Sequence, residues 1–344
     1  MNALGSLADP SRYREPIDID GEDPGVLVAQ LRSLIQIRTV EEFLADRVAA
    51  GEIICPCHLA IGQEAIPVGV SVHLRASDRV FGNHRSHGHF LALGGSTLEL
   101  LAETLGRATG CSHGMGGSMH LQDRRVGFIG SVPIVGATVP LAVGAGLAAR
   151  MDGKGDVAVA YFGDGATEEG VVHESLNFAA RFNTPIIFVV ENNLFSSHLH
   201  ILERQPADSV ARFATAHEIE HRVVDGNDVL AVSRAAESLI SRARLGEGPG
   251  FIEAVTYRWR GHVGASEDID VGVQRAAGLS EWKKRDCVTR LATALELAGH
   301  IHAGFVAEHQ GLIRRDCDLA WEEALAAPYP DPQDLIDFVY GGRR

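Results

Sequence analysis

Apolar runs and polar breaks alternate along residues 157–193 in a pattern that predicts a strand, a helix and a second strand. Val157–Phe162 is a short apolar run that a Gly-Asp-Gly turn ends, and Ile186–Val190 is a second, fully apolar run. Between the two runs, the apolar residues keep a roughly helical spacing until Asn183-Thr184-Pro185 ends the helix. Such a unit pairs its strands in parallel, usually as neighbours, with a right-handed crossover.

The same patterns predict the other elements of the chain. Segments with the pattern of helices are Val26–Ala50, Ala60–Leu74 with an interruption at Pro67, Val139–Arg150, Asp228–Ala243 and the stretch from about Leu279 to Ala327. Two apolar runs, Val223–Gly226 and Phe251–Tyr257, predict later strands of the same sheet. The simplest account is an α/β fold with a mostly parallel sheet flanked by helices. We divide it into an extended N-terminal arm (1–25), an α/β domain (26–278) and a C-terminal helical extension of that domain (279–344).

Composition narrows the class of protein. The chain has 344 residues, of which 45% are hydrophobic, so it can bury a substantial core. Its net charge of −14 argues against a nucleic-acid partner. No apolar stretch reaches the roughly 18 residues of a membrane span, and residues 1–16 lack the pattern of a secretory signal. We therefore expect a cytoplasmic protein without a membrane partner.

The cysteines are five in number and scattered, which suits a reducing cytosol. Cys55-Pro56-Cys57 is the one closely spaced pair. Its spacing is not that of a C-x-x-C redox motif, and no second pair follows to complete a metal site. We interpret these residues as unreactive thiols.

Two polar side chains follow the two predicted strands. Asp164 comes directly after the first strand and Asn193 closely follows the second. The carboxyl ends of parallel strands share one edge of the sheet, and ligands of open α/β sheets bind at that edge. A carboxylate and an amide oxygen provide half of a hard-cation site, in which magnesium keeps its remaining positions for water and phosphate oxygens.

This pairing of GDG with a later NN resembles the thiamine diphosphate-binding motif. The segments HRSHG, GGSMH, IVGA, GDGA and ENN follow one another in the order seen in one family. Over roughly Val26 to Glu323, the chain resembles the alpha subunit of the decarboxylating component of 2-oxo acid dehydrogenase complexes, and also the alpha subunit of acetoin dehydrogenase. The resemblance implies a thiamine diphosphate-binding fold with thiamine diphosphate and Mg²⁺ as cofactors.

The resemblance assigns residues to the metal ion and the diphosphate. Asp164 and Asn193 would each give Mg²⁺ a side-chain oxygen, and Phe195 would give its backbone carbonyl. The family usually has Tyr at the position of Phe195, and a carbonyl ligand tolerates either side chain. Gly165 and Ala166 would present small residues and their N–H groups to the diphosphate.

Other positions would contact the rest of the cofactor. Arg85 matches the arginine that grips the diphosphate, and a guanidinium suits phosphate oxygens well. His84 replaces a tyrosine of the family and can still donate to phosphate. The segment Ile134–Ala137, which includes Val135, matches the segment whose backbone meets the aminopyrimidine. Pro133, just before it, cannot donate a backbone N–H.

Two histidines match catalytic positions. His262 corresponds to the histidine that heads the active-site loop, where it can donate to the reacting carbonyl or carboxylate. His58 corresponds to a histidine near the cofactor and the substrate channel. Residues 263–265 are Val-Gly-Ala where mitochondrial relatives carry regulatory serines, so control by phosphorylation of this loop is not expected.

The resemblance also implies a partner. The carboxylate that activates the aminopyrimidine lies, in this family, on a separate beta subunit, and no Glu here is a persuasive substitute. We therefore expect half an active site in an alpha2-beta2 heterotetramer, with the small-residue helix Pro140–Ala149 at or near the contact. The enzyme would decarboxylate a 2-oxo acid, or cleave acetoin, and pass the acyl group to lipoamide, with a lipoyl acyltransferase as a further partner. The amino-terminal half of a split transketolase-like enzyme and a non-catalytic cofactor-binding scaffold remain as alternatives.

Overall fold

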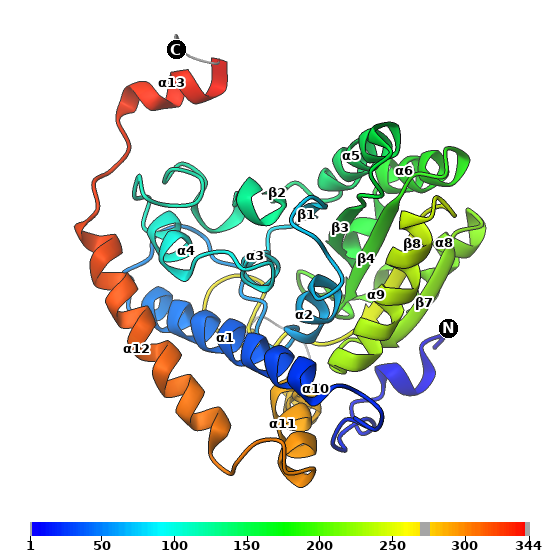
Figure 1. Ribbon diagram of the computed structural model, residues 1–344, viewed down its shortest axis with the longest axis horizontal. Helices are drawn as coiled ribbons and strands as arrows, with labels where there is room; N and C mark the ends of the chain where they lie inside the picture. Colours follow the sequence, from blue (N-terminus) through cyan, green and yellow to red (C-terminus); the bar gives the residue numbers. More distant parts are fainter. Residues whose placement is uncertain (1, 269–275, 341–344) are drawn as a thin grey trace.

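A six-stranded sheet forms the centre of the chain. The computed structural model describes residues 2–268 and 276–340, and within them every pairing of this sheet is parallel, in the order β2-β1-β3-β4-β8-β7 (Figure 1). The strands are β1 (Arg79–Gly82), β2 (Phe128–Ser131), β3 (Ala158–Gly163), β4 (Ile186–Asn192), β7 (Glu220–Asp225) and β8 (Gly250–Val255). A separate antiparallel pair consists of β5 (Phe195–Ser196) and β6 (Leu199–His200).

Helices cover both faces of the sheet. Alternate residues of β3 point to opposite cores: Val159 belongs to the core under α2 and α9, and Ala160 to the core under α5 and α6. Burial on both faces explains why the central strands are continuous apolar runs. The helices are α1 (Pro24–Ala49), α2 (Ala65–Ser71), α3 (His87–Ala92), α4 (Thr97–Thr104), α5 (Thr138–Asp152), α6 (Gly170–Arg181), α7 (Ile201–Arg204), α8 (Ala211–Ala216), α9 (Val229–Arg244), α10 (Ala276–Trp282), α11 (Cys287–Leu297), α12 (Phe305–Ala326) and α13 (Pro332–Tyr340).

A helical layer lies beside the sheet. The long helix α1 packs against α11 and α12, and α12 continues along α4, while α13 stands away from the body of the chain (Figure 1). The buried Arg38 of α1 links the helices of this layer, because its guanidinium donates to Glu64, just before α2, and to Asp286, just before α11.

Short 3-10 turns are η1 (Gly5–Ala8), η2 (Gly117–Met119), η3 (Arg124–Val126), η4 (Asp164–Glu168) and η5 (Lys283–Arg285).

The predicted strand–helix–strand unit is confirmed as β3, α6 and β4, with β3 and β4 parallel neighbours. The helices predicted at Val26–Ala50 and Val139–Arg150 are α1 and α5, and the two later strands are β7 and β8. Elements β1, β2, α3 and α4 were not predicted, because they are only four to eight residues long and show no clear period.

Two predicted helices need correction. The helix expected over Ala60–Leu74 begins only at Ala65, and Pro67 lies in its first turn, where a missing N–H costs no hydrogen bond. The helical stretch expected to Ala327 is divided, because Gly299 and Gly304 adopt φ values of 73° and 90° between α11 and α12.

The predicted division into arm, domain and extension stays a prediction, and residues 1 and 341–344 at its two ends lie outside the described residues. In the predicted arm, Leu4 and Ile17 are buried in the two cores. None of the helices in the described ranges has the length and apolar character that a membrane crossing requires.

Candidate active site

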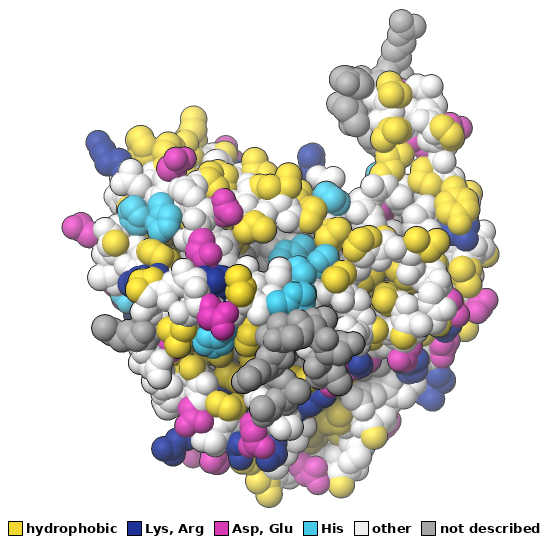
Figure 2. All heavy atoms as spheres, turned by 180° about the vertical axis from the view of Figure 1, so that it is seen from behind, with side chains coloured by type: hydrophobic (Ala, Val, Ile, Leu, Met, Phe, Trp, Pro, Cys, Tyr) yellow, Lys and Arg dark blue, Asp and Glu magenta, His cyan; other side chains and the backbone are white. Residues whose placement is uncertain are grey.

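A single cavity at the carboxyl edge of the sheet gathers every site residue that the sequence predicts. Its wall contains His58, His84, Arg85, Val135, Asp164, Gly165, Ala166, Asn193, Phe195 and His262. These residues come from segments far apart in the sequence, and histidine side chains gather in a hollow of one face of the molecule (Figure 2). Open parallel sheets bind their ligands at this edge.

The register of the sheet brings Asp164 and Asn193 to the same edge. Gly163 pairs with Glu191, so Asp164 leaves the end of β3 beside the end of β4, from which Asn193 follows. Both side chains are buried, with relative exposures of 1% and 7% for the residues. The expected juxtaposition of a carboxylate and an amide is therefore present.

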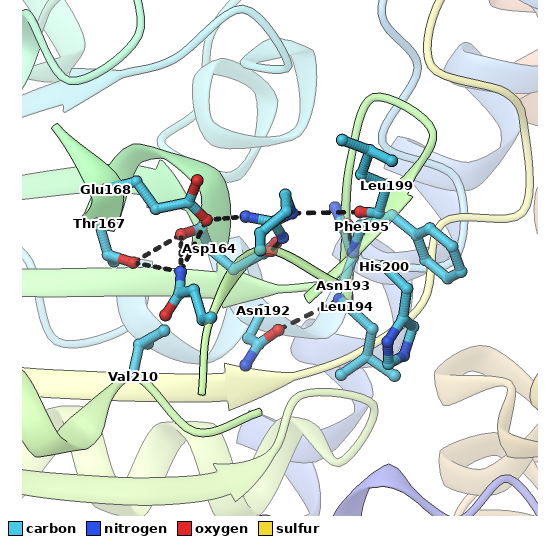
Figure 3. Close-up of polar contacts among 12 residues, drawn as sticks. Asp164, Thr167, Glu168, Asn192, Asn193, Leu194, Phe195, Leu199, His200 and Val210 are labelled. Carbon is cyan, nitrogen blue, oxygen red and sulfur yellow. Dashed lines mark hydrogen bonds and ion pairs between the residues drawn. The ribbon is translucent and has the colours of Figure 1, made fainter. Parts of the chain in front are cut away.

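A cation not anticipated from the sequence engages Asp164. Arg204, at the end of α7, pairs with Oδ2 of Asp164 and with Glu168, while its Nε donates to the carbonyl of Leu199 at 3.2 Å (Figure 3). Burial raises the pKa of the Asp164 carboxyl above its ordinary value, and Arg204 opposes that shift. A buried carboxylate needs such a positive partner. No sequence motif marks Arg204 as part of the site.

The amide of Asn193 is held in one orientation. Its Nδ2 donates to Oε1 of Gln63 at 2.9 Å, and its Oδ1 accepts from the backbone N–H of Phe195 at 3.2 Å. Nε2 of Gln63 is buried without a hydrogen-bond partner among the described residues. Sequence reasoning missed Gln63, although it lies in the HLAIGQEA segment around His58.

The residues present fit a hard cation and a phosphate group. The carboxylate of Asp164, the amide oxygen of Asn193 and the carbonyl of Phe195 are oxygen donors of the kind that Mg²⁺ prefers. A Cβ atom on Gly165 would lie only 2.5 Å from Oγ of Ser196, so this position accepts only glycine as the turn stands. The turn can therefore lie close to β5, and its backbone can approach a ligand in the cavity.

Three histidines from separate segments meet in the cavity. Nitrogen atoms of His58, His84 and His262 all lie within 4.8 Å of one another. Burial lowers the pKa values of these side chains to about 3, about 2 and about 4, respectively, and the nearby charge of Arg85 adds to the shift. They are therefore neutral at pH 7. Nδ1 of His58 and Nδ1 of His262 are buried and find no hydrogen-bond partner within the described ranges, which leaves them for a ligand.

Two buried guanidinium groups surround the histidines. Arg85 donates to the carbonyls of Leu59 at 2.7 Å and His262 at 3.1 Å, so it fastens two cavity segments together. Arg258 donates to the carbonyl of Ser197 at 2.5 Å. Guanidinium groups in a cavity favour an anionic ligand. Arg258 was not predicted, although it stands only four residues before His262.

One carboxylate in the cavity wall was also missed. Glu191 of β4 accepts from Nδ2 of Asn83 at 2.9 Å, and its other oxygen lies 2.9 Å from Nε2 of His89. Glu191 begins the ENN triplet, so its position in the motif could have identified it. These bonds hold the loop after β1 against β4.

The opposite wall is open and apolar. Val132–Gly136 line the cavity, yet Ile134 and Val135 are 70% and 51% exposed. Exposed apolar side chains at the mouth of a polar cavity are typical of a surface that a ligand or a partner covers.

The histidine pKa values predict a pH-dependent stability. The unfolded chain protonates His84 near pH 6.5, whereas the folded chain protonates it only near pH 2. As the pH falls below 6.5, protons therefore favour the unfolded state, and stability decreases. Between pH 6.5 and pH 5, His84 contributes up to about 2 kcal/mol to this loss. Urea unfolding at the two pH values should show a smaller difference for His84→Gln, and an equal difference would contradict a neutral His84.

Comparison with known proteins gives the family. Residues 32–333 match the family described as dehydrogenase E1 component. The chain is 38% identical over 324 residues to the alpha subunit of the acetoin:2,6-dichlorophenolindophenol oxidoreductase of Cupriavidus necator, covering 92% of this chain and 95% of that protein. It is 40% identical over 336 residues to the pyruvate dehydrogenase E1 component subunit alpha of Zymomonas mobilis, covering 97% and 92%. The chain therefore belongs to the dehydrogenase E1 component family.

Proposed function

We propose that this chain is the alpha subunit of a thiamine diphosphate- and Mg²⁺-dependent dehydrogenase that acts on a 2-oxo acid or on acetoin. The observation that carries the proposal is the convergence of Asp164, Asn193, Arg85 and neutral histidines in one cavity. Relatives named for acetoin and for pyruvate are about equally similar, so both substrates stay open. The proposed acyl acceptor is lipoamide on a lipoyl acyltransferase, and the proposed location is the cytoplasm.

The proposed roles at the phosphate end follow from the oxygen donors. Since Arg204 engages Oδ2 of Asp164, Oδ1 is the oxygen that Asp164 would give to Mg²⁺. The amide oxygen of Asn193 and the carbonyl of Phe195 would complete the ligands from this chain. Arg85, the N–H groups of Gly165 and Ala166, and a donor from His84 would hold the diphosphate.

The proposed chemistry assigns the other end of the cavity to the substrate. When bound, thiamine diphosphate supplies the electron sink for the carbanion that forms as a carbon–carbon bond breaks. The backbone around Val135 would meet the aminopyrimidine. His262 and His58 would donate to the reacting carbonyl or carboxylate, since a neutral imidazole can both give and accept a proton.

The proposed partner is a beta subunit. Relatives are named as alpha subunits, and the exposed side chains of Ile134 and Val135 suit a covering surface. Leu141 of α5 is also exposed, at 57%, which supports a contact along the predicted helix Pro140–Ala149. A split transketolase-like half and a non-catalytic scaffold remain the alternatives.

The function and the need for a partner are tested together. The chain is purified alone and with its co-expressed beta subunit, then supplied with thiamine diphosphate, Mg²⁺ and 2,6-dichlorophenolindophenol. We expect pyruvate- or acetoin-dependent dye reduction only with both subunits. Turnover by the pure chain would contradict the half-site, and a correctly assembled complex that turns over neither substrate would contradict the proposed substrate class.

The metal site is tested by Asp164→Asn, which keeps the size of the side chain but removes its charge. We expect Mg²⁺-dependent thiamine diphosphate binding by the assembled complex to be lost in calorimetry. The matched control is Asp152→Asn, whose carboxylate pairs with Arg79 away from the cavity. Equal cofactor affinity in the two variants would contradict the assignment of Asp164.

Substitutions at Arg85 and His262 should distinguish cofactor binding from the catalytic step. Arg85→Ala should mainly weaken cofactor binding, because it removes a charge-assisted contact to the diphosphate. His262→Ala should bind the cofactor nearly as well as the unmodified chain, yet lower turnover by on the order of 10²–10⁴-fold. Calorimetry and steady-state rates measure the two effects, and full turnover of His262→Ala would refute its catalytic role.

A further inference from the structure

A pair of cysteines lies in the segment that leads into the cavity. Cys57 directly precedes His58, and its carbonyl accepts a hydrogen bond from the N–H of Gly264 at 2.8 Å, two residues beyond His262. The backbone of this pair therefore joins the segments that carry two of the three cavity histidines. The proposed function uses neither thiol.

The two thiols have unequal surroundings. Cys55 is partly exposed, whereas Cys57 is buried. The neighbouring Cys57 thiol lowers the pKa of the Cys55 thiol to about 6, against the opposing effect of burial. The same contact and burial raise the pKa of Cys57. Cys55, whose Sγ lies 3.4 Å from the carbonyl oxygen of Thr104, is therefore the more readily ionised of the two thiols, and Cys57 stays protonated beside it. An attacking and a resolving cysteine differ in this way.

Charged groups from neighbouring helices face the pair. His87, at the start of α3, lies 3.2 Å from Glu41 of α1 and 2.8 Å from the hydroxyl of Ser118. Burial disfavours a charge on His87, but Glu41 raises its pKa above the ordinary value. The positive charge of His87 adds to the stabilisation of the Cys55 thiolate, and the negative charge of Glu41 adds to the high pKa of Cys57.

The spacing permits a disulfide between the two residues. Two residues of chain span at most about 7 Å, and disulfides join Cα atoms that are roughly 4.4–6.8 Å apart. The thiol of Cys57 donates to the carbonyl oxygen of Cys55 at 3.5 Å, which turns the Cys57 side chain back toward Cys55. By contrast, Cys111 and Cys317 have pKa values that burial raises to about 12, so they are poor nucleophiles.

We propose that Cys55 and Cys57 are a redox-sensitive site, in which a hydroperoxide converts the two thiols into a reversible disulfide beside the active site. The thiolate of Cys55 attacks one oxygen of the peroxide, so that an S–O bond forms, the O–O bond breaks and hydroxide leaves. The sulfur of Cys57 then attacks the sulfur of the resulting sulfenic acid at Cys55, so that the S–S bond forms and the S–O bond breaks. The hydroxide that leaves the sulfenic acid takes the proton of the Cys57 thiol and departs as water. The two sulfurs are oxidised by two electrons, and the peroxide is reduced. This revises the interpretation of the pair as unreactive thiols.

The disulfide would act on the cavity through the backbone. Drawing the two sulfurs together rotates the chain at Cys57, which moves His58 and the carbonyl that holds Gly264. Displacing an active-site group by about 1 Å can cost on the order of 10²-fold in rate, so we expect turnover to fall at least about tenfold. This consequence rests on the proposed function, whereas formation of the disulfide does not.

The test oxidises the assembled complex with a slight excess of hydrogen peroxide, unfolds it in urea so that every remaining thiol can react with iodoacetamide, and maps the alkylated cysteines by mass spectrometry. We expect Cys55 and Cys57 to lose alkylation together, Cys111 to keep it, and dithiothreitol to restore the pair. In Cys57→Ser, Cys55 should be trapped by dimedone as a sulfenic acid. A Cys55 that dimedone traps in the unmodified chain, or one that reacts no faster than Cys111, would overturn the proposal.

The activity readout uses Cys111→Ser as the matched control. The unmodified complex and Cys111→Ser should both lose turnover on oxidation and regain it with dithiothreitol. Full turnover with the disulfide mapped in place would refute its effect on the active site. A complex that never turns over would contradict the proposed function alone, because the mapping still decides whether the disulfide forms.

Discussion

The parallel pairing of β3 with β4 is the constraint on which the rest of this site depends. Parallel strands end at the same edge, so the residues that follow them, Asp164 and Asn193, meet without any further device. The carboxylate of Asp164 is buried at this edge, which is costly because water no longer solvates it. Arg204 meets that need from a different element, and Asn193 is fixed by Gln63 on the other side.

The cavity wall contains two buried guanidinium groups, and its histidines add no further charge. Arg85 and Arg258 supply two buried cations, and their field, together with burial, keeps His58, His84 and His262 neutral. A neutral imidazole remains both a donor and an acceptor, whereas an imidazolium only donates. The arrangement therefore suits an anionic ligand at the guanidinium groups and a proton-accepting or proton-donating step at the histidines.

Backbone carbonyls join the separate segments of the cavity into one unit. Arg85 bonds the carbonyls of Leu59 and His262, and the carbonyl of Cys57 accepts from Gly264. The segments before β1 and after β8 thus hold each other in place across the sheet edge. A displacement of the backbone at Cys57 therefore displaces Gly264 directly, because the two residues share a hydrogen bond of 2.8 Å.

The sequence by itself determined the strand–helix–strand unit, the edge of the sheet at which the cavity lies and the identity of the side chains at the two strand ends. These features depend on local periodicity and on the fixed geometry of parallel crossovers, which residues 157–193 contain within themselves. It did not determine β1, β2 or α3, which are only four to six residues long and show no clear period, or the true start of α2. Only the tertiary structure showed that Arg204 pairs with Asp164, that Gln63 orients Asn193, and that three histidines converge. These partners come from segments that are distant in the sequence, so only the packing of the folded chain brings them together. Burial in that packing also sets the pKa values of the histidines, which the sequence alone does not show.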